Sequence, residues 1–171
     1  MTNKIENEKS AEYNTGHVPD QNEKEMVDYQ EEIIDQALEI LQNRIRNGIL
    51  LNSAADVKSW LHLKCHKMER EVFGLVVVDN QHHYLGDTEL FYGTVDGARV
   101  HPREVVKYVL ELNGVGVMLY HNHPSGSADA SQADLRITEK LKSALKLIDV
   151  RVLDHLIVGD EVTSMAEKGL I

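Results

Sequence analysis

Two histidines and an aspartate stand at a spacing that could hold a metal ion. His121 and His123 lie two residues apart, at the end of an apolar stretch typical of a buried strand. Because side chains two residues apart on an extended chain point to the same side, both imidazoles could reach one ion. Pro124 and Gly126 then turn the chain, so Asp134, in the first turn of the next expected helix, could fold back toward them.

This set of ligands predicts a hydrolytic metal site. Two imidazole nitrogens and one carboxylate oxygen leave a fourth position open, as in catalytic rather than structural zinc sites. The mixture of imidazole and carboxylate favours zinc over magnesium or calcium, although iron, manganese or cobalt could also bind. Water in the open position would have a lowered pKa, and a nearby carboxylate would be needed to accept its proton. We therefore expect one Zn²⁺ ion per chain.

Each half of the pattern also has an ordinary structural interpretation. A His-x-His pair near a strand end is often only a pair of polar edge residues. Ser131-x-x-Asp134 is the pattern of a helix-capping box, in which the serine begins the helix. The two interpretations are compatible, because Asp134 could cap the helix and still turn an oxygen toward a metal.

The elements that would position these residues alternate between strands and helices. Continuous runs rich in Val, Leu and Ile predict buried strands. Stretches with apolar residues every three or four positions predict helices. The expected strands are 72–78, 84–85, 90–95, 115–120, 150–158 and a short one near 162, and the expected helices are 53–66, 101–113 and 135–148. This alternation predicts an α/β fold, with one layered sheet flanked by helices.

The N-terminal part has a different character. Residues 1–22 are polar and acidic, with too little apolar content to offset the entropy of ordering, so we expect a disordered tail. Residues 23–48 carry one apolar stripe and predict an amphipathic helix. This helix could pack on the compact domain, expected over 49–171, or form a homodimer through residues 23–47.

Composition excludes several classes of protein. The 171 residues include 18 Lys and Arg against 28 Asp and Glu, a net charge of −10, which argues against broad nucleic-acid binding. A single cysteine, Cys65, rules out an intrachain disulfide, a Cys-based zinc ribbon and a zinc deaminase with its Cys pair. Since neither a secretory signal nor an apolar run of membrane-spanning length is visible, we expect a cytoplasmic protein without membrane association.

The motifs also match a known family. His121-x-His123, followed after seven residues by Ser131-x-x-Asp134, resembles the JAMM (MPN+) metalloprotease motif. Three further stretches resemble the RadC family of bacterial MPN-domain proteins: HPREV at 101–105, HNHPSG at 121–126 and LDH at 153–155. The resemblance covers about residues 50–171.

This resemblance implies a fold, an activity and two further site residues. It implies a JAMM/MPN (cytidine-deaminase-like) fold and a zinc metallopeptidase or isopeptidase that acts on an amide bond of a peptide or protein. The family pattern places a general base before the first strand, where Glu71 stands and Glu69 is the rival. In the same pattern Ser131 supports the tetrahedral intermediate, as a hydroxyl donor would.

Two alternatives come from other functional classes. The resemblance also allows a DNA-repair-associated protein without peptidase activity, although the net charge argues mildly against it. A metal-stabilised interaction module is the other alternative. Asp154 and His155, on the last long strand, could be partners that orient a ligand histidine, or a polar pair at the sheet edge.

Overall fold

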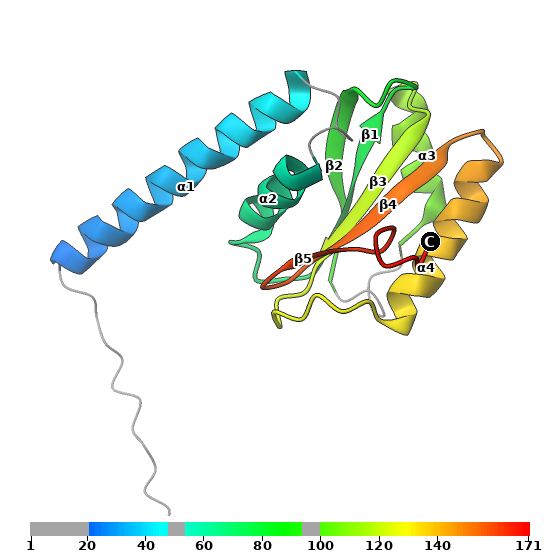
Figure 1. The fold of residues 1–171 in the computed structure, drawn as a ribbon. Helices are drawn as coiled ribbons and strands as arrows, with labels where there is room; N and C mark the ends of the chain where they lie inside the picture. The colour runs from blue at the N-terminus through cyan, green and yellow to red at the C-terminus, as the bar shows by residue number, and fades with distance from the viewer. Residues whose placement is uncertain (1–20, 48–53, 94–99) are drawn as a thin grey trace, which may run out of the picture. The chain divides into compact units, whose positions relative to one another are not determined.

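A computed structural model describes residues 21–47, 54–93 and 100–171. Its elements in chain order are α1 (Gln21–Asn47), α2 (Ala54–Cys65), β1 (Val72–Val78), β2 (Tyr84–Tyr92), α3 (Pro102–Glu111), β3 (Gly116–Asn122), α4 (Gln132–Lys146), β4 (Arg151–Val158) and β5 (Val162–Ser164). The strands form one five-stranded sheet in the order β2-β1-β3-β4-β5, with helices on both faces (Figure 1). The predicted α/β class is confirmed, and the architecture is consistent with a JAB/MPN-type fold.

The sheet is mixed. β1 pairs antiparallel with β2 and with β3, and β4 pairs antiparallel with β5. β3 and β4 are parallel neighbours, and the chain passes from one to the other through α4. A parallel pair requires such a crossover, which brings the first turn of α4 close to the carboxyl end of β3.

The central strands are buried because both faces of the sheet are covered. Every residue of β1 and of β3 is buried, as their unbroken apolar runs predict. Trp60 and Leu61 of α2 pack with Tyr120 on one face. On the opposite face, Phe73 and Leu119 belong to the cluster that holds α3 and α4. Alternate residues of β3 therefore point to different faces, and His121 shares its face with Leu119.

The prediction of two short strands, 84–85 and 90–95, separated at Gly86 and Asp87, is wrong. β2 runs without a break from Tyr84 to Tyr92, with Gly86 and Asp87 paired to β1. The Asp87 carboxylate lies 2.5 Å from Lys64 Nζ and also accepts the Tyr84 hydroxyl. Pairing with β1 and these contacts outweigh the turn preference of the Gly-Asp dipeptide. The last two residues of the predicted second strand lie outside the described residues.

Helix α1 begins slightly earlier than predicted. Residues 1–20 of the predicted disordered tail lie outside the described residues, and Gln21 and Asn22 already belong to the helix. The described part of the chain divides into two units between Ile33 and Ile34, within α1. Within the second unit, Ile45 is 1% exposed and joins the core cluster of α2, with Leu38 and Leu41 packed against it.

The C-terminal half of α1 therefore packs on the domain, whereas the dimer through residues 23–47 stays a prediction. The predicted boundary at 48–49 also falls outside the described residues. Neither α1 nor any other helix in the described part of the chain combines the length and the apolar run that crossing a bilayer requires.

Candidate metal centre

The end of β3 positions both histidines. His121 is the next-to-last residue of the strand and pairs with Phe73 of β1 and Ile157 of β4, so its backbone is held from both sides. His123 follows the strand directly, and its N–H donates to the carbonyl oxygen of Val158 at 2.8 Å. The side chain of His121 is fully buried, and that of His123 is 14% exposed. Their spacing of two residues puts both rings on one side of the sheet, as predicted.

A capping box positions the aspartate. Ser131 is the N-cap of α4, and its hydroxyl accepts the Asp134 N–H at 3.2 Å. In return, Asp134 Oδ2 accepts the Ser131 N–H at 2.7 Å. The two residues thereby satisfy donors that a helix start otherwise leaves unpaired. Oδ1, the second carboxylate oxygen, is left to face the histidines.

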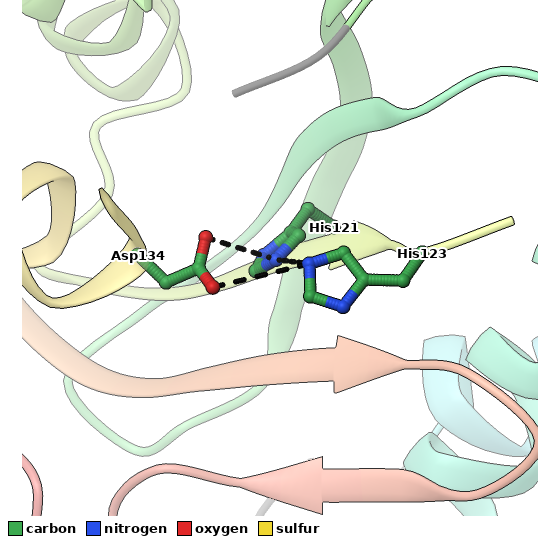
Figure 2. Close-up of side chains that lie close together, drawn as sticks. All are labelled: His121, His123 and Asp134. Atoms are coloured by element: carbon green, nitrogen blue, oxygen red, sulfur yellow. Dashed lines mark hydrogen bonds and ion pairs between the residues drawn. The ribbon is translucent and has the colours of Figure 1, made fainter. Parts of the chain in front are cut away.

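The three side chains converge on one point (Figure 2). His121 Nε2 lies 3.0 Å from His123 Nε2 and 3.2 Å from Asp134 Oδ1. His123 Nε2 lies 3.9 Å from Asp134 Oδ2. Ligands about 2.0–2.1 Å from a tetrahedral zinc ion would be about 3.3 Å apart, and the separations of 3.0 and 3.2 Å around His121 Nε2 are close to that value. The predicted set of His121, His123 and Asp134 is therefore brought together, and it could hold a metal ion.

The contact made by Nδ1 of His123 indicates which of its two ring nitrogens carries the proton. Its Nδ1 lies 2.8 Å from the carbonyl oxygen of Ser127, which can only accept a hydrogen bond. Nδ1 must therefore carry the proton, and a neutral His123 presents an unprotonated Nε2 to the cluster. This is the form of histidine that binds metals.

The carboxylate of Asp134 is fully buried and lacks a matching donor. Among the described residues, none donates a hydrogen bond to its Oδ1. Burial would raise the pKa of Asp134, but the neighbouring His121 imidazole and the contacts with Ser131 outweigh burial and hold that pKa below its usual range. One carboxylate oxygen without a donor and two imidazole nitrogens converge here, which is a set of ligand atoms that a divalent cation could bind.

Behind the cluster lies a third histidine, His155 of β4. Its Nε2 is 2.8 Å from His121 Nδ1, and its Nδ1 is 2.6 Å from Thr138 Oγ1 of α4. Full burial and the neighbouring imidazole of His121 lower the pKa of His155 well below that of an ordinary histidine, so it is neutral. Of the two interpretations of 154–155, partners of a ligand histidine or an edge pair, the contact with His121 supports the first for His155.

Asp154 points elsewhere. Its carboxylate accepts hydrogen bonds from the Ser164 hydroxyl at 2.5 Å and the Ala166 N–H at 2.9 Å. It also accepts the backbone N–H of His155 at 2.7 Å, so it fixes the C-terminal turn and the His155 main chain.

The other two predicted site residues stand at the starts of two elements, Ser131 at the start of α4 and Glu71 just before β1. Ser131 is exposed, directly beside the buried Asp134. Glu71 is half-buried and immediately precedes β1, whereas Glu69 is exposed. The predictions for Glu71 as general base and Ser131 as oxyanion donor stay predictions.

Sequence reasoning missed Asn122 and Thr138. Asn122, between the two histidines, is 3% exposed and faces the opposite side of the sheet. Its Oδ1 accepts the Val72 N–H at 2.7 Å, and its Nδ2 donates to the Arg70 carbonyl oxygen at 3.0 Å. The alternation of side chains between the two faces of a strand could have identified Asn122. A residue between two metal ligands on a strand must point away from the metal.

Comparison with known proteins agrees with this geometry. A family model described as a RadC-like JAB domain matches residues 51–170, so the fold is that of a JAB-domain protein. The chain is 54% identical over 142 residues to a UPF0758 protein of Vibrio cholerae serotype O1, covering 82% of this chain and 90% of that protein. It is 47% identical over 138 residues to a UPF0758 protein of Cellvibrio japonicus, covering 80% of this chain and 62% of that protein. The chain belongs to the RadC family, which confirms the resemblance in its motifs.

Proposed function

We propose that this protein is a zinc-dependent hydrolase of the JAMM type, which cleaves an amide or isopeptide bond in a peptide or protein. The observation that carries the proposal is the convergence of two Nε2 atoms 3.0 Å apart and the unpartnered Asp134 Oδ1, 3.2 Å from one of them. A purely structural cluster would place donors opposite these acceptors. Three ligands from the chain also leave one position open, as a catalytic zinc site requires.

In this proposal His121, His123 and Asp134 hold one zinc ion. When bound, the ion would polarise a carbonyl group and lower the pKa of a water molecule to near 7. Glu71 takes the proton of the attacking water and delivers it to the leaving amine. The remaining requirement is that Glu71 reaches the same side of the sheet as the histidines.

The backbone around Glu71 supports that role. Phe73, two residues later, pairs with His121, and the two rings stack with centroids 6.3 Å apart. Residues two apart on an extended chain share a face, which supports a Glu71 side chain on the same side of the sheet as the histidines. Asn122 bonds Arg70 and Val72, the two neighbours of Glu71, and so holds this segment against the end of β3.

The position of Ser131 supports its role as an oxyanion donor. Its Oγ accepts the Asp134 N–H, so its own hydroxyl proton is directed away from the helix. Because Ser131 is exposed and adjacent to a ligand, that proton can be donated to negative charge developing on a substrate oxygen.

Metal content tests the ligand assignment. The purified protein should bind one equivalent of zinc by mass spectrometry, His121→Ala should bind far less, and the control His66→Ala should match the wild type because His66 is exposed in a turn after α2. Equal zinc in the wild type and His121→Ala would refute the assignment.

Hydrolysis tests the enzymatic step. A mixed library of internally quenched peptides should be cleaved by the zinc-loaded wild type and not by Glu71→Gln, which should keep its zinc. Glu69→Gln is the matched control, and it should cleave like the wild type. If Glu69→Gln lost the activity and Glu71→Gln kept it, the base would be Glu69. Full zinc occupancy without cleavage of any probe would instead favour a metal-stabilised interaction module.

A role in binding DNA would be tested by a different measurement, the binding of duplex DNA at several salt concentrations. Direct duplex binding depends on cations that displace phosphate counterions, and this chain has a net charge of −10. We expect weak binding of labelled duplex DNA at all salt concentrations. Tight binding with a steep salt dependence would favour the DNA-associated alternative.

A further inference from the structure

We propose that His155 and Thr138 are positioning residues that hold His121 with its Nε2 lone pair turned toward the metal. The inference rests on the proposed metal site and assigns new roles to two residues outside the ligand set. Both side chains are buried, His155 at 0% and Thr138 at 1% exposure. They lie on β4 and α4, on the side of His121 that faces away from the other ligands.

A chain of hydrogen bonds joins His121 to the backbone of Asp134. His121 Nδ1 lies 2.8 Å from His155 Nε2, and His155 Nδ1 lies 2.6 Å from Thr138 Oγ1. Thr138 Oγ1 in turn lies 2.6 Å from the carbonyl oxygen of Asp134, one helical turn earlier. We call His121, His155 and Thr138 the relay. It begins at one proposed metal ligand and ends on the main chain of another.

The carbonyl group at its end sets the direction of every bond in the relay. A carbonyl oxygen can only accept, so the single hydroxyl proton of Thr138 is donated to Asp134. Thr138 Oγ1 must then accept from His155 Nδ1–H. A neutral His155 protonated at Nδ1 has a lone pair at Nε2, which accepts from His121 Nδ1–H. A neutral His121 consequently carries no proton on Nε2, the nitrogen 3.2 Å from Asp134 Oδ1.

The opposite direction is unfavourable at its last step. If His121 carried its proton on Nε2, two imidazole lone pairs would face each other at 2.8 Å unless His155 turned its own proton to Nε2. Thr138 would then have to donate to His155, which would leave two oxygens 2.6 Å apart with no proton between them. Two buried oxygens in contact with no proton between them repel each other, which disfavours this direction.

Surrounding side chains keep water from replacing a member of the relay. The ring of Phe73 meets His155 edge-on, with centroids 5.5 Å apart. Met165 is 0% exposed, its Sδ lies 3.9 Å from Thr138 Oγ1, and its N–H donates to the His155 carbonyl oxygen at 3.0 Å. The hydrogen bonds of the relay must therefore come from the protein itself, and removal of one member breaks the chain.

Zinc affinity of matched variants tests the proposal. We would titrate each protein with zinc alone in competition with a chromophoric chelator. His155→Leu should bind zinc about 10–100-fold more weakly, as is typical when a partner of a metal-binding histidine is lost. His155→Gln can place an acceptor oxygen near the former Nε2 and should recover most of the loss. Thr138→Val should weaken zinc binding by about 10-fold, the lower end of that range. Thr138→Ser should bind zinc like the wild type.

Nitrogen-15 spectra of the histidine rings give a second readout, in the metal-free protein. In the wild type His121 should be protonated at Nδ1 and not at Nε2, and Thr138→Val should convert it to a mixture of tautomers. Since valine nearly matches threonine in shape, this pair serves even if His155→Leu does not fold.

The outcomes separate this inference from the proposed function. Wild-type zinc affinity in both His155→Leu and Thr138→Val, or an Nε2-protonated His121 in the metal-free wild type, would overturn the inference alone. A wild-type protein that binds no zinc would overturn the proposed function. The relay would then have no metal toward which to orient His121.

Discussion

Replacing Asp134 by asparagine separates its two tasks, which are starting helix α4 and facing the two imidazoles. An asparagine side-chain oxygen in the place of Oδ2 can still accept the Ser131 N–H, now at 2.7 Å. The amide nitrogen then takes the place of Oδ1, 3.2 Å from His121 Nε2, where the described residues offer no donor. The substitution therefore turns an unsatisfied acceptor into a donor that faces a lone pair.

The metal-free and zinc-loaded proteins should respond in opposite directions. Without metal at pH 8, where an ordinary imidazole is neutral, Asp134→Asn should be at least as stable as the wild type, since one added buried hydrogen bond contributes about 0.5–1.5 kcal/mol. With zinc at a hundred times its dissociation constant, the wild type should gain about 2.7 kcal/mol. For a domain of this size that gain raises Tm by about 5–11 °C. Asp134→Asn should lose most of this increase, because a neutral amide is a poor ligand for zinc.

Thermal unfolding followed by circular dichroism, with EDTA and then with zinc, measures both effects. Asp129→Asn is the matched control, because the Asp129 side chain is 92% exposed in the same loop and should leave both Tm values unchanged. A zinc-induced rise in Tm of wild-type size in Asp134→Asn would refute the assignment of Oδ1 as a ligand. A metal-free Asp134→Asn several degrees less stable than the wild type would refute the argument that Oδ1 lacks a donor.

Three further predictions concern the scaffold around the site. Asn122→Asp exchanges the donor to the Arg70 carbonyl oxygen for a second acceptor, and urea denaturation should show a loss of roughly 1–3 kcal/mol. Gly74→Ala should lower stability by about 1–3 kcal/mol in the same assay, because the new Cβ would lie 2.4 Å from Tyr120 Cζ. Burial raises the pKa of the Cys65 thiol to about 12, so only about one molecule in 10,000 carries the thiolate at pH 8, and modification by iodoacetamide should require unfolding.

The sequence was sufficient to predict the cluster of His121, His123 and Asp134 because the arrangement of these residues is local. His121 and His123 share a face through the period of the strand, and Asp134 is fixed by a capping box whose members are three residues apart. The continuous apolar runs likewise predicted β1 and β3, since a strand buried on both faces has no polar positions.

What could not be predicted depends on contacts between distant segments. Thr138 occupies an ordinary position in the middle of a helix, and it reaches His155 only because β4 pairs with β3 in a register that sets His155 beside Leu119. Periodicity along the chain carries no information about that register. The unbroken course of β2 through Asp87 has the same origin, because it depends on Lys64 of α2, 23 residues earlier.

At the end of β3, side chains on the two faces of the strand have different roles. His121 turns toward α4 and Asp134, while Asn122 turns to the opposite face and holds Arg70 and Val72 on either side of Glu71. His121 and the predicted base Glu71 are thereby held on neighbouring, hydrogen-bonded segments of backbone, although they are 50 residues apart in the chain. A shift of β1 against β3 by one residue would reverse every side chain and separate them. The buried Asn122 opposes such a shift, because in another register its amide would lose both backbone partners.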